Sequence, residues 1–254
     1  MATDTETAPA AGGSARAEFD RRSVRHQERA RRQRPFLLGI ALVSSVVAAV
    51  AFATNVSPLL GWFALAVLIG SLGRMVPTPN HVTAWATGAD GEERTAAALE
   101  PLIAVGFRIL HDRRIPRSRA NIDHLVVGPP GIFVIETKSF SGKLEIRGSD
   151  VYVAGRRRTS MLDKVRREVA SVETALGPEL AALGIRVMPL VCVHRAELPL
   201  FRSEADGIPI VSAKGMVKRL QAAPARLDLA AVERLTSAAD VRLRAASPSP
   251  KRVA

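Results

Sequence analysis

The strongest constraint on the fold of this chain is a segment without a charged side chain, which runs from Pro35 to Gly73. It is about twice as long as the ~20 apolar residues that one transmembrane helix requires. Turn-forming residues at 55–58 divide it. Because backbone groups inside a bilayer must be hydrogen-bonded locally, we expect a hairpin of two transmembrane helices, at about 36–54 and 59–76.

A signal peptide or the buried hairpin of a soluble protein would account for the uncharged segment less well. A signal peptide has a shorter apolar region nearer the N-terminus, and a soluble hairpin normally keeps a polar face. Arginines are frequent between Arg21 and Arg34, whereas the loop between the two spans has none. The positive-inside rule therefore places the N-terminus in the cytoplasm, and two crossings return the chain there. We expect a multi-pass protein of the plasma membrane, with the lipid bilayer as one partner.

The composition separates the chain into four parts. The expected parts are a disordered and basic N-terminal segment at 1–34 (its arginine run being a helix or a disordered arm), two transmembrane helices at 35–76, a soluble domain at 84–245 and a disordered tail at 246–254.

The cysteine count and the net charge limit the compartment and the partners. The only cysteine, Cys192, excludes an intramolecular disulfide and a multi-cysteine zinc site, and it suits a reducing compartment. A net charge of +12 favours polyanionic partners, nucleic acid or anionic lipid, although a genome that favours Ala and Arg would produce the same charge.

Periodicity within the soluble domain predicts an α/β fold. Apolar residues recur at helical spacing in some segments and alternate or run continuously in others. The order of a helix, several strands, a helix and a strand indicates a mixed sheet. The predicted helices are 88–104, 162–183, 214–221 and 227–243, and the predicted strands are 107–111, 121–127, 132–138, 143–147, 151–153, 186–193 and 208–211.

Charged residues interrupt two of these apolar strands. Asp123 lies in the first, and Glu136 and Lys138 end the second, after a turn at 128–131. Residues two apart in a strand share a face, so Glu136 and Lys138 project together. Antiparallel pairing brings Asp123 near Glu136 if the register places them opposite each other. Carboxylates suit Mg²⁺ or Mn²⁺, and a metal with a nearby amine suits phosphodiester hydrolysis. The competing interpretation is a structural network of ion pairs.

Several short motifs surround these residues: Gly88-Ala-Asp-Gly-Glu92, His111-Asp112, Asn121-Ile-Asp-His124 and Gly131-Ile-Phe-Val-Ile-Glu-Thr-Lys138 with a later Gly142. Together they resemble the NERD (nuclease-related) domain, a branch of the PD-(D/E)xK superfamily. The resemblance implies a restriction-endonuclease-like core with a mixed central sheet flanked by helices. It also implies a metal-dependent nuclease that uses Mg²⁺ or Mn²⁺ and acts on nucleic acid, DNA rather than RNA. The implied catalytic residues are Glu92, Asp123, Glu136 and Lys138, with the three acids as metal ligands.

One feature of the family pattern is missing. Family members often have a glutamine near the start of the helix that follows the hairpin, and residues 163–166 contain none. A basic residue could substitute for it, or the activity could be altered. The alternative function is therefore a catalytically inactive module of the same fold, which binds nucleic acid or a protein partner at the membrane.

The remaining charged residues allow two interpretations each. Glu92 and Glu93 fit the first turn of a helix, where ordinary charge pairing with the helix dipole accounts for them equally well. His124 alternates away from Asp123, so we expect a packed side chain. The helix that carries Lys164 is interpreted as a core-packing helix with a basic outer face. The loop before Asp123 is either a solvated basic loop or a phosphate-binding one, and its arginines are Arg113, Arg114, Arg117 and Arg119.

Overall fold

The computed structural model describes residues 11, 13–54, 57–73, 80–116, 118 and 120–246. They form two compact units, Glu18–Trp85 and a second unit of Met1–Ala17 with Ala86–Ala254. Three segments lie mostly or wholly outside the described residues: the N-terminal part before Gly13, which was expected to be disordered, the linker at 74–79 and the tail from residue 247.

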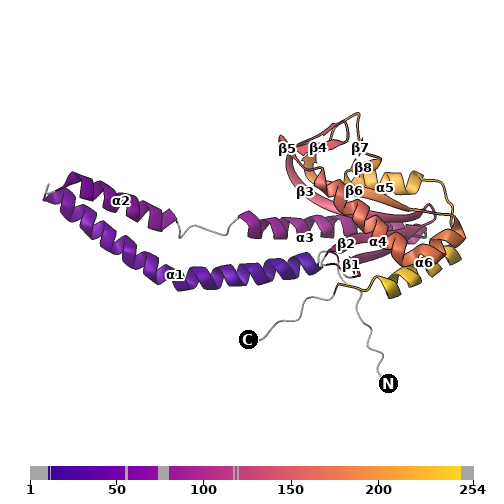
Figure 1. The fold of residues 1–254 in the computed structure, drawn as a ribbon, viewed down its shortest axis with the longest axis horizontal. Helices are drawn as coiled ribbons and strands as arrows, with labels where there is room; N and C mark the ends of the chain where they lie inside the picture. Colours follow the sequence, from indigo (N-terminus) through magenta and orange to yellow (C-terminus); the bar gives the residue numbers. More distant parts are fainter. Residues whose placement is uncertain are drawn as a thin grey trace, which may run out of the picture. The chain divides into compact units, whose positions relative to one another are not determined.

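The first unit contains a helical hairpin (Figure 1). Helix α1 spans Gly13–Ala53 and α2 spans Pro58–Gly73, so the arginine run belongs to a helix. The rings of Phe52 and Trp62 pack edge to face, with centroids 5.7 Å apart. A Cβ at Gly61 would lie 2.8 Å from the tip of the Phe52 ring, so the ring can take this position because residue 61 is a glycine. The hairpin therefore has specific packing between its helices.

Among the described residues of this unit, one helical segment is long and apolar enough to cross a membrane. It spans Arg31–Ala53, 23 residues with a mean hydropathy of 2.5. The apolar part of α2, Pro58–Leu72, is shorter. Large apolar side chains of both helices, including Leu42 and Phe63, are exposed in the structure. The first predicted span is thus matched by length and composition, and the second crossing stays a prediction.

The second unit is built on the predicted mixed sheet. Strand order is β1-β2-β3-β6-β8-β7, and β4 and β5 extend from the outer half of β3. The β1–β2, β2–β3 and β7–β8 pairs are antiparallel, whereas β3–β6 and β6–β8 are parallel. The strands are β1 (Arg108–Arg114), β2 (Asn121–Gly128), β3 (Gly131–Arg147), β4 (Asp150–Val153), β5 (Arg156–Arg157), β6 (Val187–Glu197), β7 (Glu204–Ala205) and β8 (Ile208–Val211).

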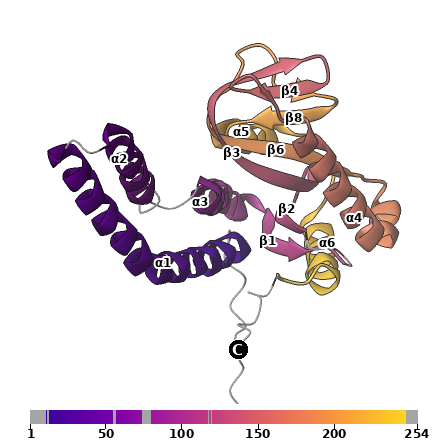
Figure 2. The same cartoon turned by 60° about the vertical axis from the view of Figure 1, so that its left-hand side comes forward.

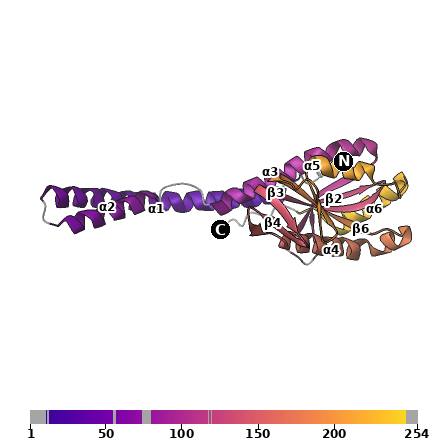
Figure 3. The same cartoon turned by 90° about the horizontal axis from the view of Figure 1, so that it is seen from above.

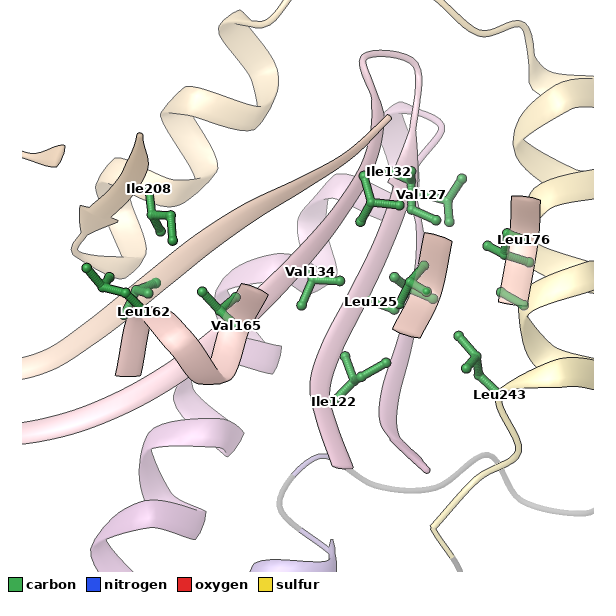
Figure 4. Close-up of a cluster of buried hydrophobic side chains, with 14 of the residues drawn as sticks. Ile122, Leu125, Val127, Ile132, Val134, Leu162, Val165, Leu176, Ile208 and Leu243 are labelled. Atoms are coloured by element: carbon green, nitrogen blue, oxygen red, sulfur yellow. The ribbon is translucent and has the colours of Figure 1, made fainter. Parts of the chain in front are cut away.

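Helices cover both faces of this sheet, as the view in Figure 3 shows. Helices α4 (Ser160–Leu183) and α6 (Leu229–Arg242) bury side chains such as Leu176 and Leu235 against Leu125 of β2. Figure 4 shows this cluster, with Val165 of α4 next to Val134 of β3. Each fully buried aliphatic side chain of this kind contributes about 1.5–3 kcal/mol through removal from water. The α4 face therefore holds the larger core.

The opposite face carries a second core. Helix α3 (Asn80–Leu99), the 3₁₀ helix η1 (Glu100–Val105) and α5 (Ala213–Ala222) pack there (Figure 2). Alternation along β2 and β3 sends Val126, Phe133 and Ile135 to this face, and Val127 and Val134 to the α4 face. The paired parts of these strands are consequently apolar on both sides, and a charged side chain among them, such as Glu136, is buried.

Three expected boundaries are wrong. Helix α3 begins at Asn80 rather than 88, so Glu92 lies well inside it and not in its first turn. Gly91 is no start signal; it lets α3 approach the sheet, because a Cβ there would lie 2.3 Å from Ser139 Oγ. Strand β3 runs unbroken through 132–147, since β6 pairs along it past a bulge between Ser139 and Gly142. Strand β1 extends to Arg114, which removes two arginines from the predicted loop.

Candidate active site

The two central carboxylates meet on the α4 face of the sheet. The β2–β3 register pairs His124 with Ile135, and one further step along both strands places Asp123 opposite Glu136. Asp123 Oδ2 accepts a hydrogen bond of 2.8 Å from the backbone N–H of Thr137. The side chain of Glu136 is fully buried. The structure therefore brings these two acids together on one face of the sheet. The sequence predicted this proximity only if the register placed the two residues opposite each other, and the register does so.

Two ammonium groups lie between the carboxylates. Lys138, two residues after Glu136 on the same face, donates to Glu136 Oε1. Lys164 of α4 donates to Glu136 Oε2 and lies 3.5 Å from Asp123 Oδ1. The interpretation of Lys164 as part of a basic outer face is wrong, because its ammonium points at the site. The sequence signal that could have found it is its position one helical turn before a buried glutamate.

That glutamate, Glu168, is a site residue that the sequence motifs did not identify. It lies between Val165 and Val172 in the apolar stripe of α4 and is 1% exposed. Its Oε1 lies 2.8 Å from the Lys164 ammonium, and neither of its oxygens makes a well-oriented hydrogen bond. The sequence did contain a signal for this residue: a glutamate in the apolar stripe of a helix is expected to have a buried cationic partner, since unpaired acids are very rarely buried.

Glu92 of α3 is coupled to the same group of charges. Burial, followed by the negative charges of Asp123 and Asp112, raises the pKa of Glu92 to about 9. At neutral pH its carboxyl group is therefore mainly protonated in this structure. The charge of Glu92 thus interacts with that of Asp123 from the middle of a helix, and its role as a metal ligand stays a prediction.

Burial and mutual repulsion set the protonation of the other acids. Burial and then the charge of Glu136 raise the pKa of Glu168 to about 8. Burial and then Asp123 raise the pKa of Glu136. Burial alone would raise the pKa of Asp123 as well, but Lys164 and Lys138 outweigh it and lower that pKa. Asp123 is thus the most firmly ionised acid of the group.

The same interactions keep Lys164 charged. Burial alone would lower the pKa of this lysine, but the charges of Asp123, Glu136 and Glu168 raise it. The site consequently contains more carboxyl groups than ammonium groups, and the pKa values of two of the acids, Glu92 and Glu168, are raised. An opposite charge nearby favours the ionised form of a carboxyl group, so a further cation would favour ionisation of these acids.

The donor set fits a hard divalent cation. Asp123 and Glu136 offer oxygens within reach of a single cation, because one ammonium group contacts both. Within the described part of the chain, no group of three or more His, Cys, Asp or Glu side chains is arranged to hold a metal ion. That excludes a closed cage made of those residues, but Mg²⁺ is commonly held by one or two carboxylates and completes its shell with water.

The opposite face carries a polar network that connects α3 to the strands of the site. Thr137 Oγ1 donates a hydrogen bond of 3.0 Å to Thr95 Oγ1. Thr95 Oγ1 also lies 2.8 Å from His194 Nε2, and 3.6 Å from the buried thiol of Cys192. Thr95 lies one helical turn after Glu92, and Thr137 lies between Glu136 and Lys138. The network therefore helps to fix the position of α3 relative to β3.

His124 is a packed residue, as predicted. It is fully buried, and its Nδ1 lies 2.8 Å from Nδ1 of His111. Burial lowers the pKa of His124 to about 3, so the imidazole is neutral. Its side chain lies on the face that Asp123 does not use, and it supports the strand rather than the chemistry.

The four arginines predicted to bind phosphate do not behave alike. Arg113 is 4% exposed and forms an ion pair of 2.5 Å with Asp240 of α6, so the prediction that it binds nucleic acid is wrong. Its side chain points toward the end of α6, where Nη1 also donates a hydrogen bond of 3.4 Å to the Leu243 carbonyl. Arg114 is exposed and remains a predicted phosphate contact. Arg117 and Arg119 lie outside the described residues.

A family model described as nuclease-related domain matches residues 87–194. The match covers Glu92, Asp123, Glu136, Lys138 and Lys164, and it confirms the resemblance inferred from the motifs. No match was found among curated proteins or among solved structures.

Proposed function

The chain contains a nuclease-related domain at residues 87–194, and from this premise we propose that it is a membrane-anchored nuclease that depends on Mg²⁺ or Mn²⁺. The observation that carries the proposal is the convergence of Asp123 and Glu136 on one ammonium group, on the same face of the sheet. A purely structural fold has no need to bury several carboxyl groups at one point, since each costs free energy unless it is paired.

The residues present suggest a role for each group. Asp123 and Glu136 would hold the ion, and Glu92, whose charge is coupled to theirs, would join them only after losing its proton. When bound, a divalent ion would supply Lewis acidity and neutralise the negative charge of the scissile phosphate. The hydrogen bond from the Thr137 N–H fixes Asp123 Oδ2, which leaves Oδ1 directed toward the cation position.

Lys138 would act on the phosphate itself. Its side chain is 29% exposed, so the ammonium can reach a phosphate outside the strand while its stem stays on the α4 face. A fixed positive charge there would stabilise the additional negative charge of the transition state. Because its partner Glu136 is buried and immobile, the ammonium is held in place before the substrate arrives.

The substrate class follows from charge and from the family resemblance. The net charge of +12 favours a polyanion, and Arg114, Arg156 and Arg158 are exposed on the second unit. DNA rather than RNA is proposed on the resemblance alone.

The proposed location is the inner face of the plasma membrane. The segment Arg31–Ala53 would form one crossing, and the shorter α2 would return the chain. The arginines that precede the first crossing support a cytoplasmic N-terminus by the positive-inside rule. Two crossings would then place the nuclease-related domain in the cytoplasm as well, where nucleic acid is present.

A catalytically inactive module is the second candidate, and one observation favours it. Lys164 already neutralises Asp123 and Glu136, so the acids have a cation without any metal. Such a module would bind nucleic acid or a protein partner at the membrane and would not cut.

A cleavage assay separates the two functions. The full chain, purified in detergent, would be incubated with single-stranded DNA, double-stranded DNA and RNA, with Mn²⁺ or with a chelator. Mn²⁺-dependent cleavage that disappears in Asp123→Asn supports the nuclease. Binding of the same substrates without cleavage supports the inactive module. The absence of both binding and cleavage contradicts both candidates.

A further inference from the structure

Lys164 occupies the centre of the candidate site. Its ammonium contacts Glu136 Oε2 and Glu168 Oε1 and lies 3.5 Å from Asp123 Oδ1, so it has three carboxylate partners. Lys138, by comparison, has one carboxylate partner among the described residues, Glu136. The cation that joins the two metal-binding carboxylates is therefore supplied by α4 and not by the catalytic strand.

A divalent ion and this ammonium group compete for the same oxygens. Any ion held by Asp123 and Glu136 would lie within a few ångströms of the ammonium position. Two positive charges that close together repel each other, even at the effective dielectric constant of a protein surface. The ammonium must therefore withdraw before both carboxylates can hold the ion.

Glu168 provides a place for the withdrawn ammonium. It lies one turn after Lys164 on the same helix, where residues four apart are neighbours. Glu168 is buried and its ion-pair partner is Lys164, so it stays available when Asp123 and Glu136 change partner. The Lys164 side chain is 31% exposed and has a flexible four-carbon stem, which allows the movement without a shift of the helix.

We propose that Lys164 is an internal cation that fills the divalent-ion position of the free protein, and that it moves onto Glu168 when the ion binds. The inference rests on the proposed function, since it takes Asp123 and Glu136 as ligands of an ion. It goes beyond that function, because it makes the Lys164 ammonium a competitor that sets the concentration at which the divalent ion binds.

The test measures ion binding rather than cleavage. The full chain in detergent would be titrated with Mn²⁺, and the free ion followed by electron paramagnetic resonance. Lys164→Gln removes the competitor and should bind Mn²⁺ at least about tenfold more tightly than the unmodified chain. Lys143→Gln is the matched control, because Lys143 is an exposed lysine paired with Glu145 outside the site. Its affinity should remain within about twofold of the unmodified chain.

A second pair of variants tests the role of Glu168. Glu168→Gln leaves Lys164 with the two ligand carboxylates alone and should weaken Mn²⁺ binding. In the Lys164→Gln background the same change should have little effect, because Glu168 acts through Lys164. Additive effects of the two substitutions would contradict this coupling. If Lys164→Gln unfolds the protein, Glu168→Gln alone still tests the inference, because it keeps Lys164, and unchanged Mn²⁺ binding in it would contradict the role of Glu168.

The outcomes distinguish this inference from the proposed function. Tighter binding in Lys164→Gln supports the internal cation, whether or not the unmodified chain cuts DNA. Equal or weaker binding in Lys164→Gln overturns it and leaves the nuclease proposal intact, provided that the unmodified chain binds Mn²⁺. If neither protein binds Mn²⁺, the inference fails together with the metal dependence of the proposed function.

Discussion

The hydroxyl group of Thr137 donates a hydrogen bond of 3.0 Å to the hydroxyl group of Thr95. This contact lies on the face of the sheet that the carboxylates do not use. Thr137 nevertheless belongs to the strand segment that carries Glu136 and Lys138, and Thr95 belongs to the helix that carries Glu92. Because Thr95 lies one turn after Glu92 on the same helix, this contact helps to fix the position of Glu92 relative to β3.

Removing this contact should loosen the site without dismantling the fold. We expect Thr95→Val, which keeps the volume and loses the hydroxyl group, to weaken Mn²⁺ binding severalfold and to lower the free energy of unfolding by about 1–2 kcal/mol. Thr174→Val is a suitable control, since Thr174 bonds only to the Ala170 carbonyl of its own helix at an exposed position. Equal Mn²⁺ affinities in the two variants would show that Thr95 has no positioning role.

Asp123 should be essential for cleavage. Asp123→Asn keeps the hydrogen bond to the Thr137 N–H but removes the charge that holds a cation, so we expect the cleavage rate to fall at least about 10³-fold. Asp163→Asn serves as the control, because Asp163 is an exposed acid of α4 paired with Arg166. Gel-based cleavage of labelled DNA gives both rates. Comparable activity in both variants would remove Asp123 from the mechanism.

Lys138 should affect the rate more than ion binding. Lys138→Met removes the ammonium group and keeps most of the stem, so the cleavage rate should fall by about 10²–10³-fold. Mn²⁺ affinity should not fall, because the substitution removes a positive charge next to Glu136. A parallel loss of rate and affinity would mean that Lys138 shapes the ion site instead of acting on phosphate.

Arg113 should contribute to stability and Arg114 should not. Arg113→Ala leaves Asp240 without its partner and opens space beside α6, so we expect a loss of about 2–3 kcal/mol. Arg114→Ala, at the neighbouring exposed position, should change stability by less than about 0.5 kcal/mol and should weaken DNA binding instead. Urea unfolding followed by circular dichroism measures the first effect, and a salt-dependent binding curve measures the second.

His124 should make the protein less stable in acid. Its pKa is about 3 in the folded protein, whereas the ordinary histidine pKa of 6.5 applies in an unfolded chain. Above pH 6.5 both states are neutral and the stabilisation is complete. As the pH falls below 6.5, the unfolded chain binds a proton that the folded protein does not, so the free energy of unfolding decreases until the pH approaches 3.

The expected size of this effect is about 2 kcal/mol between pH 7.5 and pH 5. His124→Asn should lose that part of the pH dependence, whatever its absolute stability. The difference between the two stability curves is the decisive quantity, because the raised pKa values of Glu92 and Glu168 change stability in the opposite direction. Parallel curves for the two proteins would show that His124 titrates normally.

Local sequence patterns predicted much of this fold. Strand β8 was predicted with its observed bounds, and α4 and the β2–β3 hairpin lie within a few residues of the prediction. These elements have strong apolar periodicity and clear turn residues. The start of α3 was misplaced because Gly88 and Gly91 look like a helix boundary, whereas Gly91 meets a requirement of tertiary packing against Ser139.

The site was predictable where it depends on strand geometry. Alternation along β3 was sufficient to place Glu136 and Lys138 on one face. The contributions of Lys164 and Glu168 depend on how α4 docks onto the sheet, and no local pattern specifies that packing. Arg113 was misjudged for a related reason: its burial depends on α6, an element more than a hundred residues later in the chain.

The thiol of Cys192 offers an experimental opportunity. It is fully buried, and burial raises its pKa to about 11, so it carries almost no thiolate at neutral pH. Maleimide reagents attack thiolates, and the native chain should therefore remain unlabelled. Since Cys192 is the only cysteine, one introduced near the N-terminus or in the segment between α1 and α2 would be the sole reactive group. Membrane-impermeant labelling of intact cells could then map the topology of the hairpin without a cysteine-free background.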